Sequence, residues 1–158
     1  HTRRRRQRQM CIRDRMMTLY YHATINNSIV VGTGNKVEDF GIGFYTKYGD
    51  GGVDISPIAD LMKSEIFEIS KELKINKEIL EAKPTDGLWD DDRTDEDQIG
   101  ASYDDLERVM NSLENGVSPE KFDDKTREDF NIYIKHHNAN KHKMKSIPVC
   151  KIPIELKS

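Results

Sequence analysis

The chain has 158 residues, of which 35% are hydrophobic, so it is long enough for one domain with a modest core. Its net charge of −3 at pH 7 combines a basic start with an acidic body, because residues 1–15 carry +6 and residues 16–158 carry −9. No stretch approaches the roughly 18 apolar residues of a membrane span and the start lacks the apolar core of a secretory signal, so we expect no membrane partner. We also expect no nucleic-acid partner, because the arginine run lies in a segment that does not look native.

The basic start, HTRRRRQRQMCIRDR, resembles the translation of a sequencing adapter, although an arginine run is otherwise typical of a nucleic-acid arm or an import signal. We therefore expect residues 1–15 to be a non-native arm and residues 16–158 to be the folded body. Cys150 is the only cysteine of that body, because Cys11 belongs to the arm. A single thiol forms no internal disulfide, which fits a cytoplasmic protein.

The body opens with a pattern typical of α/β proteins. Apolar residues at helical spacing from Met16 predict a helix, and the β-branched run 28–31 predicts a short buried strand. After a glycine-flanked turn, Asn35 followed three residues later by Glu38 has the form of a helix start. Such a unit presents ligands at the carboxyl end of a strand, so Thr33 and Glu38 are expected at that edge.

The remainder predicts loops, helices and an extended end. The segment 48–57 is rich in glycine and aspartate and predicts a loop, and the acidic segment Thr85–Asp97 predicts a mobile surface loop that closes over ligands. Apolar periodicity predicts three helices. The first starts from a cap at Asp60 and has an inner face made of Met62, Ile66, Ile69 and Leu73. The second starts at Ser102, with Leu106, Val109, Met110 and Leu113 inward, and the third holds Phe130 and Ile134. The two Ile-Pro pairs predict an extended tail.

Several polar residues are candidates for chemistry. Asp50 and Asp54 flank adjacent glycines, which let a backbone approach a ligand, so they are acceptors for ribose hydroxyls, ammonia or a metal, or else part of a solvated turn. Lys47 and Lys63 are either solvated or close to a polyphosphate. His136, His137 and His142 lack partners at zinc-ligand spacing, so no zinc site is expected.

An ordered set of motifs spans nearly all of residues 16–153 and resembles the ammonia-dependent NAD synthetase family. The motifs are GTGNKVEDFGIGFYTKYGDGGVDISPIADLMKSE, KPTDGLW, DEDQIGASYDDLE and HKMKSIPV. This resemblance implies a parallel α/β sheet flanked by helices, Rossmann-like and of the adenine nucleotide alpha-hydrolase type, here truncated at the N-terminus, in a cytoplasmic homodimer. It makes residues 16–158 the C-terminal part of one synthetase domain. The implied reaction is a ligation in which ATP adenylates the carboxylate of deamido-NAD, and ammonia then displaces AMP.

The resemblance also implies a role for individual residues. ATP would be bound by Thr33, Lys63 and Thr85, with Glu38 as a magnesium ligand. Deamido-NAD would be bound by Lys47, Asp54, His142 and Lys143. Asp50 would line the ammonia pocket as the catalytic carboxylate.

The chain departs from the family pattern at its start, because the glycine-rich SGG-type loop that cradles pyrophosphate is absent. We therefore expect the chain to be inactive alone, with the activity belonging to an intact parent. Two other hypotheses remain: a different ATP-dependent amide-forming synthetase on the same fold, and an inert module tethered to nucleic acid by its basic arm.

Overall fold

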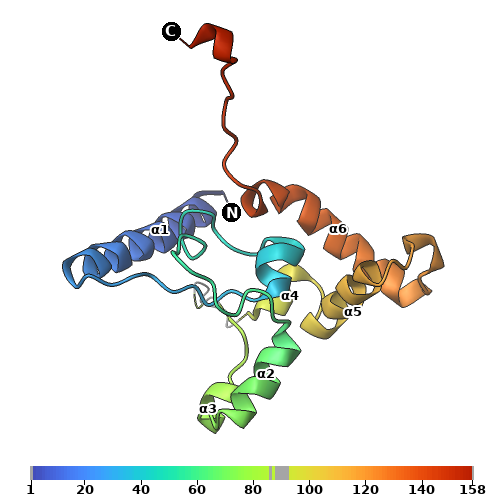
Figure 1. The fold of residues 1–158 in the computed structure, drawn as a ribbon. Helices are drawn as coiled ribbons and strands as arrows, with labels where there is room; N and C mark the ends of the chain where they lie inside the picture. Colours follow the sequence, from blue (N-terminus) through green and yellow to red (C-terminus); the bar gives the residue numbers. More distant parts are fainter. Residues whose placement is uncertain (1, 86, 88–92, 158) are drawn as a thin grey trace.

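The structure, a computed structural model, describes residues 2–85, 87 and 93–157, and its regular elements are almost all helical (Figure 1). The helices in chain order are α1 (Thr2–Ile25), the π-helix η1 (Val37–Ile42), α2 (Lys63–Glu72), α3 (Lys77–Leu80), α4 (Asp95–Ile99), α5 (Tyr103–Glu114), the 3-10 helix η2 (Pro119–Lys121), α6 (Asp124–Met144) and the 3-10 helix η3 (Ile154–Leu156).

The core lies where η1 meets α5 and α6. Leu106 and Val109 of α5 are fully buried and pack with Val37 and Ile42 of η1, and Tyr133 of α6 belongs to the same cluster. The inward face predicted for α5 is confirmed. Its Ser102 cap is confirmed too, because the Ser102 side chain accepts a hydrogen bond from the Asp105 backbone N–H. Phe130 and Ile134 pack against the same cluster, as expected.

The predicted strand over 28–31 is replaced by extended chain with a single parallel bridge between Val31 and Ile55. Within the described residues no longer strand forms, so the expected parallel sheet is not seen in this part of the chain. The prediction of a buried strand is wrong here, because Ile29 and Val31 are more than half exposed and only Val30 is buried. A short apolar run specifies a strand only when neighbouring strands cover it.

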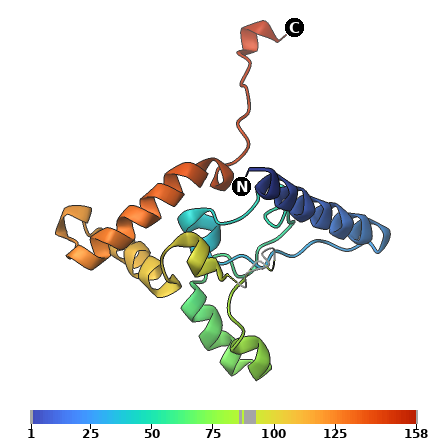
Figure 2. The same ribbon diagram turned by 180° about the vertical axis from the view of Figure 1, so that it is seen from behind.

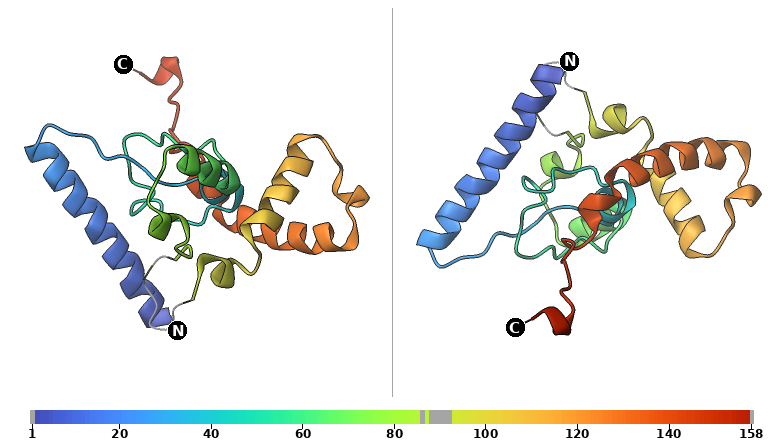
Figure 3. Two further views of the ribbon diagram at one scale, coloured as in Figure 1. Left: turned by 90° about the horizontal axis from the view of Figure 1, so that it is seen from below. Right: turned by 90° about the horizontal axis from the view of Figure 1, so that it is seen from above.

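Helix α1 lies on one side of the molecule and the α5–α6 pair on the other, with the loops of residues 28–62 between them (Figure 3). One helix runs from Thr2 to Ile25, so the change of composition at Arg15 and Met16 does not coincide with a helix end. The division between an arm and a body at this point stays a prediction.

Two further expectations need correction. The helix expected from Asp60 begins at Lys63 and is capped at Met62, and its predicted inner face is buried only at its start, because Leu73 is 68% exposed. The acidic segment is not wholly a loop, since Thr94 caps the short helix α4. Residues 86 and 88–92, on which much of the predicted closing loop falls, lie outside the described residues.

The C-terminal tail leaves the end of α6 as extended chain, as predicted, and points away from α2 and α3 (Figure 2). In the described part of the chain, no helix has the length and apolar character needed to cross a membrane.

Candidate functional site

The turn after residue 31 and the start of η1 form one wall of the candidate site. Asn35 is almost fully buried, and its Oδ1 accepts a hydrogen bond of 3.1 Å from the Glu38 backbone N–H, which confirms the helix start expected there. At Gly34 a Cβ atom would collide with the Asp39 carboxylate, so the absence of a side chain lets that carboxylate lie against the turn. A π-helical turn such as η1 is uncommon and is frequent at functional sites.

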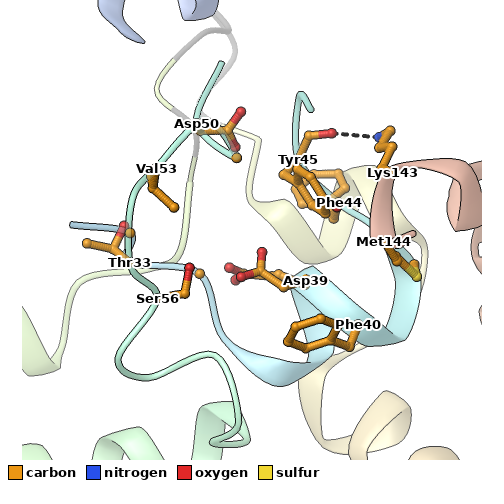
Figure 4. Close-up of a pocket in the computed structure, with 14 residues that line it drawn as sticks. Thr33, Asp39, Phe40, Phe44, Tyr45, Asp50, Val53, Ser56, Lys143 and Met144 are labelled. Atoms are coloured by element: carbon orange, nitrogen blue, oxygen red, sulfur yellow. Dashed lines mark hydrogen bonds between the residues drawn. The ribbon is translucent and has the colours of Figure 1, made fainter. Parts of the chain in front are cut away.

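A pocket opens beside this wall, with a volume of about 270 Å³ (Figure 4). It is lined by the turn at Thr33, by η1, by the loop that carries Asp50 and by the end of α6. Four residues implied by the resemblance therefore lie around one cavity: Thr33, Glu38, Asp50 and Lys143. The cavity is below the usual range for a whole drug-sized ligand, so it fits part of a nucleotide rather than two nucleotides.

The pocket is acidic, and its carboxylates influence one another. Burial, followed by the negative charges of Glu38 and Asp50, raises the pKa of Asp39 to about 6. Burial also raises the pKa of Asp50, although a 2.8 Å hydrogen bond from the Thr46 backbone N–H opposes the shift. Ionised carboxylates crowded in this way favour a cationic ligand. The sequence interpretation did not single out Asp39, and the only signal for it was its place beside Glu38.

Glu38 and Lys63, from distant parts of the chain, meet at the edge of the pocket. Lys63 Nζ lies 3.3 Å from Glu38 Oε1, and the same oxygen accepts a 2.5 Å hydrogen bond from the Tyr103 hydroxyl. The Lys63 ammonium also lies 4.8 Å from the centre of the Tyr103 ring. Burial, and then the Glu38 charge, raise the pKa of Tyr103. Tyr103 was missed as a site residue, although it stands in the motif DEDQIGASYDDLE.

The start of α2 fixes the Lys63 backbone. The Met62 N–H donates to the Glu65 carboxylate at 2.7 Å, which closes the first turn of the helix. The Ser64 N–H and hydroxyl both donate to the buried Glu107 carboxylate of α5, at 3.0 and 2.5 Å. Lys63 therefore sits on a helix start that is tied to the core.

The lysines expected to hold deamido-NAD contact backbone carbonyls in this structure. Lys143 Nζ donates to the Tyr45 carbonyl at 2.6 Å (Figure 4) and to the Gly43 carbonyl at 2.8 Å. Lys47 Nζ donates to the His142 carbonyl at 2.8 Å. Each lysine thereby ties the 43–47 turn to the end of α6. The His142 residue itself is exposed.

Asp54 and Thr85, like Lys47, Lys63 and His142, are not among the residues that line the pocket. The Asp54 carboxylate accepts hydrogen bonds from the Tyr20 hydroxyl at 3.1 Å and from the Val30 N–H at 2.8 Å, so it joins α1 to the extended segment. The Thr85 hydroxyl donates to the Arg93 carbonyl at 3.2 Å, in the acidic segment.

The donor set fits magnesium only in part. No group of three or more histidine, cysteine or acidic side chains suited to a metal occurs in the described part of the chain. Magnesium, however, is usually bound by one or two carboxylates together with substrate phosphates and water. Glu38 Oε2 makes no hydrogen bond within the described residues, so one carboxylate oxygen remains for a cation.

Comparison with known proteins decides the family. A family model described as NAD synthase matches residues 2–147. The chain belongs to the NAD synthase family. It is 44% identical over 140 residues to the NH(3)-dependent NAD(+) synthetase of Methanosarcina mazei, covering 87% of this chain and 54% of that protein. The corresponding enzyme of Archaeoglobus fulgidus is 41% identical over 140 residues, with 89% and 53% covered.

Solved structures of related enzymes share the fold. The NMN synthetase of Francisella tularensis superposes with a TM-score of 0.74 at 36% identity, covering 91% of this chain and 56% of that one. The NH3-dependent NAD synthetase of Campylobacter jejuni, in complex with a nitrate ion, gives a TM-score of 0.62 at 28% identity, with 90% and 54% covered. The chain thus spans about half the length of the relatives it matches.

Proposed function

We propose that the intact protein represented by this chain is an ammonia-dependent NAD synthetase, a ligase that converts deamido-NAD to NAD with ATP in the last step of NAD biosynthesis. The observation that carries this proposal is the NAD synthase match over residues 2–147, joined to an acidic pocket lined by the family motifs. With about half the length of its relatives, the 158-residue chain is proposed to be inactive alone.

The proposed reaction has two steps. An oxygen of the nicotinate carboxylate attacks the α-phosphorus of ATP, and the bond to pyrophosphate breaks. Ammonia then attacks the activated carbon, loses a proton, and displaces AMP. Magnesium, when bound, would neutralise the charge of the departing pyrophosphate.

The residues of this chain have separate roles in that proposal. Thr33, Lys63 and Thr85 bind ATP, with Lys63 moving from Glu38 to the phosphates and Glu38 becoming available to magnesium. Asp50 is the acidic group assigned to ammonia, because its carboxylate lines the pocket, where burial raises its pKa.

Deamido-NAD is assigned to Lys47, Asp54, His142 and Lys143. The bonds of Lys47 and Lys143 between the 43–47 turn and the end of α6 support a shared surface for Lys47, His142 and Lys143. The Asp54 carboxylate bonds to Tyr20 and Val30 instead, so its assignment rests on the motif alone. The intact protein is further proposed to contain the parallel sheet of the nucleotide alpha-hydrolase fold and to work in the cytoplasm as a homodimer, with residues 1–15 dispensable.

A second substrate is worth testing because the solved NMN synthetase gives the higher TM-score of the two structures compared above. Nicotinate mononucleotide carries the same carboxylate as deamido-NAD and lacks the AMP half. The chemistry of the pocket would therefore be unchanged, and only the dinucleotide contacts would differ.

The test joins this chain to the N-terminal half of the Methanosarcina mazei relative and measures amide formation from deamido-NAD and from nicotinate mononucleotide, with ATP, magnesium and ammonia. NAD formation with equal release of AMP supports the proposal, whereas preference for the mononucleotide assigns the second substrate. Glu38→Gln should lower kcat by about 100-fold, the scale of losing a transition-state charge contact. Glu128→Gln, on the exposed face of α6, is the matched control. No amide product from either substrate would refute the proposal.

A further inference from the structure

We propose that Tyr103 is a positioning residue that holds the Glu38 carboxylate so that one of its oxygens is committed to the protein and the other is left for a divalent cation. This inference rests on the magnesium role proposed above for Glu38. The motif resemblance assigns neither a role to Tyr103 nor different roles to the two carboxylate oxygens of Glu38.

The first observation is that both donors to Glu38 reach the same oxygen. The Tyr103 hydroxyl donates to Oε1 at 2.5 Å, and Lys63 Nζ lies 3.3 Å from Oε1. Oε2 receives no hydrogen bond from the described residues. A carboxylate held at one oxygen cannot rotate freely, so the second oxygen keeps a fixed direction.

The second observation is that Tyr103 is itself held in place. Its side chain is only 5% exposed and belongs to the core cluster. It is the first residue of α5, and its backbone N–H donates to the Glu96 carboxylate at 2.8 Å. The hydroxyl position is therefore set by the core, and the hydrogen bond transmits that position to Glu38.

The third observation separates the ring from the hydroxyl. The Lys63 ammonium lies 4.8 Å from the ring centre, a distance at which the ring attracts the cation. Phenylalanine would keep this contact and the packing of the ring. Within the described residues, the hydrogen bond to Glu38 is the only hydroxyl contact that Tyr103→Phe removes, so the substitution tests the hydroxyl.

The test measures the affinity of a fluorescent ATP analogue, by anisotropy, in magnesium and in EDTA, using the completed protein described above. The quantity compared is the ratio of the Kd of the ATP analogue in EDTA to its Kd in magnesium. A general loss of packing weakens binding in both conditions, so it leaves this ratio unchanged. The variants are Tyr103→Phe, Glu38→Gln and Tyr133→Phe. Tyr133 is the matched control because it is a tyrosine of the same core, 8% exposed, with no hydrogen bond to Glu38. Circular dichroism checks that each variant is folded.

Tyr103→Phe should reduce the magnesium effect by about tenfold, the usual scale for losing a group that orients a metal ligand. Glu38→Gln should abolish the effect, and Tyr133→Phe should leave it unchanged. If Glu38→Gln abolishes the effect while Tyr103→Phe behaves like Tyr133→Phe, the positioning role is overturned and the magnesium role stands. If Glu38→Gln retains the full effect, or the unmodified protein shows none, the magnesium role and this inference both fail.

Discussion

Asp39→Asn is expected to stabilise the folded chain at pH 8 and to have little effect at pH 4. Asp39 is held near Glu38 and Asp50, and its pKa is raised from 3.8 to about 6. Because the pKa of Asp39 is higher in the folded chain than in the unfolded chain, the free energy of unfolding falls as the pH rises from 3.8 to about 6. Above that range the full destabilisation is present. Asparagine keeps the shape of the side chain and removes the charge.

The magnitude follows from the shift. A change from 3.8 to about 6 corresponds to about 3 kcal/mol of destabilisation. Asp39 is only partly buried, so solvent screening reduces this by roughly half, to about 1.5 kcal/mol. For a chain of 158 residues, that gain raises the Tm by about 3–6 °C at pH 8.

The assay is urea denaturation of the unmodified chain and of Asp39→Asn at pH 4 and pH 8. Asp105→Asn is the control of opposite sign, because bonds from Ser102, Lys125 and then Arg108 lower the pKa of that carboxyl. Loss of the Asp105 charge should destabilise the chain at pH 8, and the difference in stability between Asp105→Asn and the unmodified chain should shrink as the pH falls. The reasoning about Asp39 is refuted if Asp39→Asn is destabilising at pH 8 or changes stability equally at both values.

Two other predictions follow from the packing and the hydrogen bonds. Leu106→Ala, at a fully buried site, should lower the free energy of unfolding by about 2–5 kcal/mol, whereas Leu73→Ala, at a 68% exposed site, should change it by less than about 0.5 kcal/mol; similar values in urea denaturation would contradict the assigned core. Asp54→Asn should weaken the bonds from Tyr20 and Val30 by about 1 kcal/mol and speed hydrogen exchange at the Val30 amide; an unchanged exchange rate would contradict this contact.

The sequence was sufficient for features whose signal is local. The spacing of Leu106, Val109 and Met110 placed one face of α5 in the core, because side chains three or four residues apart share a helix face. The Ser102 cap and the Asn35 side-chain bond to Glu38 were also readable, since each is completed within three residues. The ordered motifs indicated the family, which the comparisons bear out.

The strand expected over 28–31 shows where local signals end. Its apolar residues are present, but a strand is stabilised by the neighbours that pair with it, and only Ile55 does so among the described residues. In the same way, the acidic composition around residue 95 favoured a loop, whereas Thr94 and Asp97 cap each other and start a helix.

The geometry of the site was decided by the tertiary structure alone. The Tyr103 hydroxyl reaches Glu38 across 65 positions of sequence, and Lys143 reaches the Gly43 carbonyl across 100. No periodicity encodes contacts of that separation, because they depend on how η1, α5 and α6 pack together. The sequence by itself determined which residue types and which family are present. The packing of the helices decided that Glu38 Oε1 accepts the Tyr103 bond and that Lys63 pairs with Glu38. It also placed Asp39 in an acidic pocket where ionisation of its carboxyl is unfavourable.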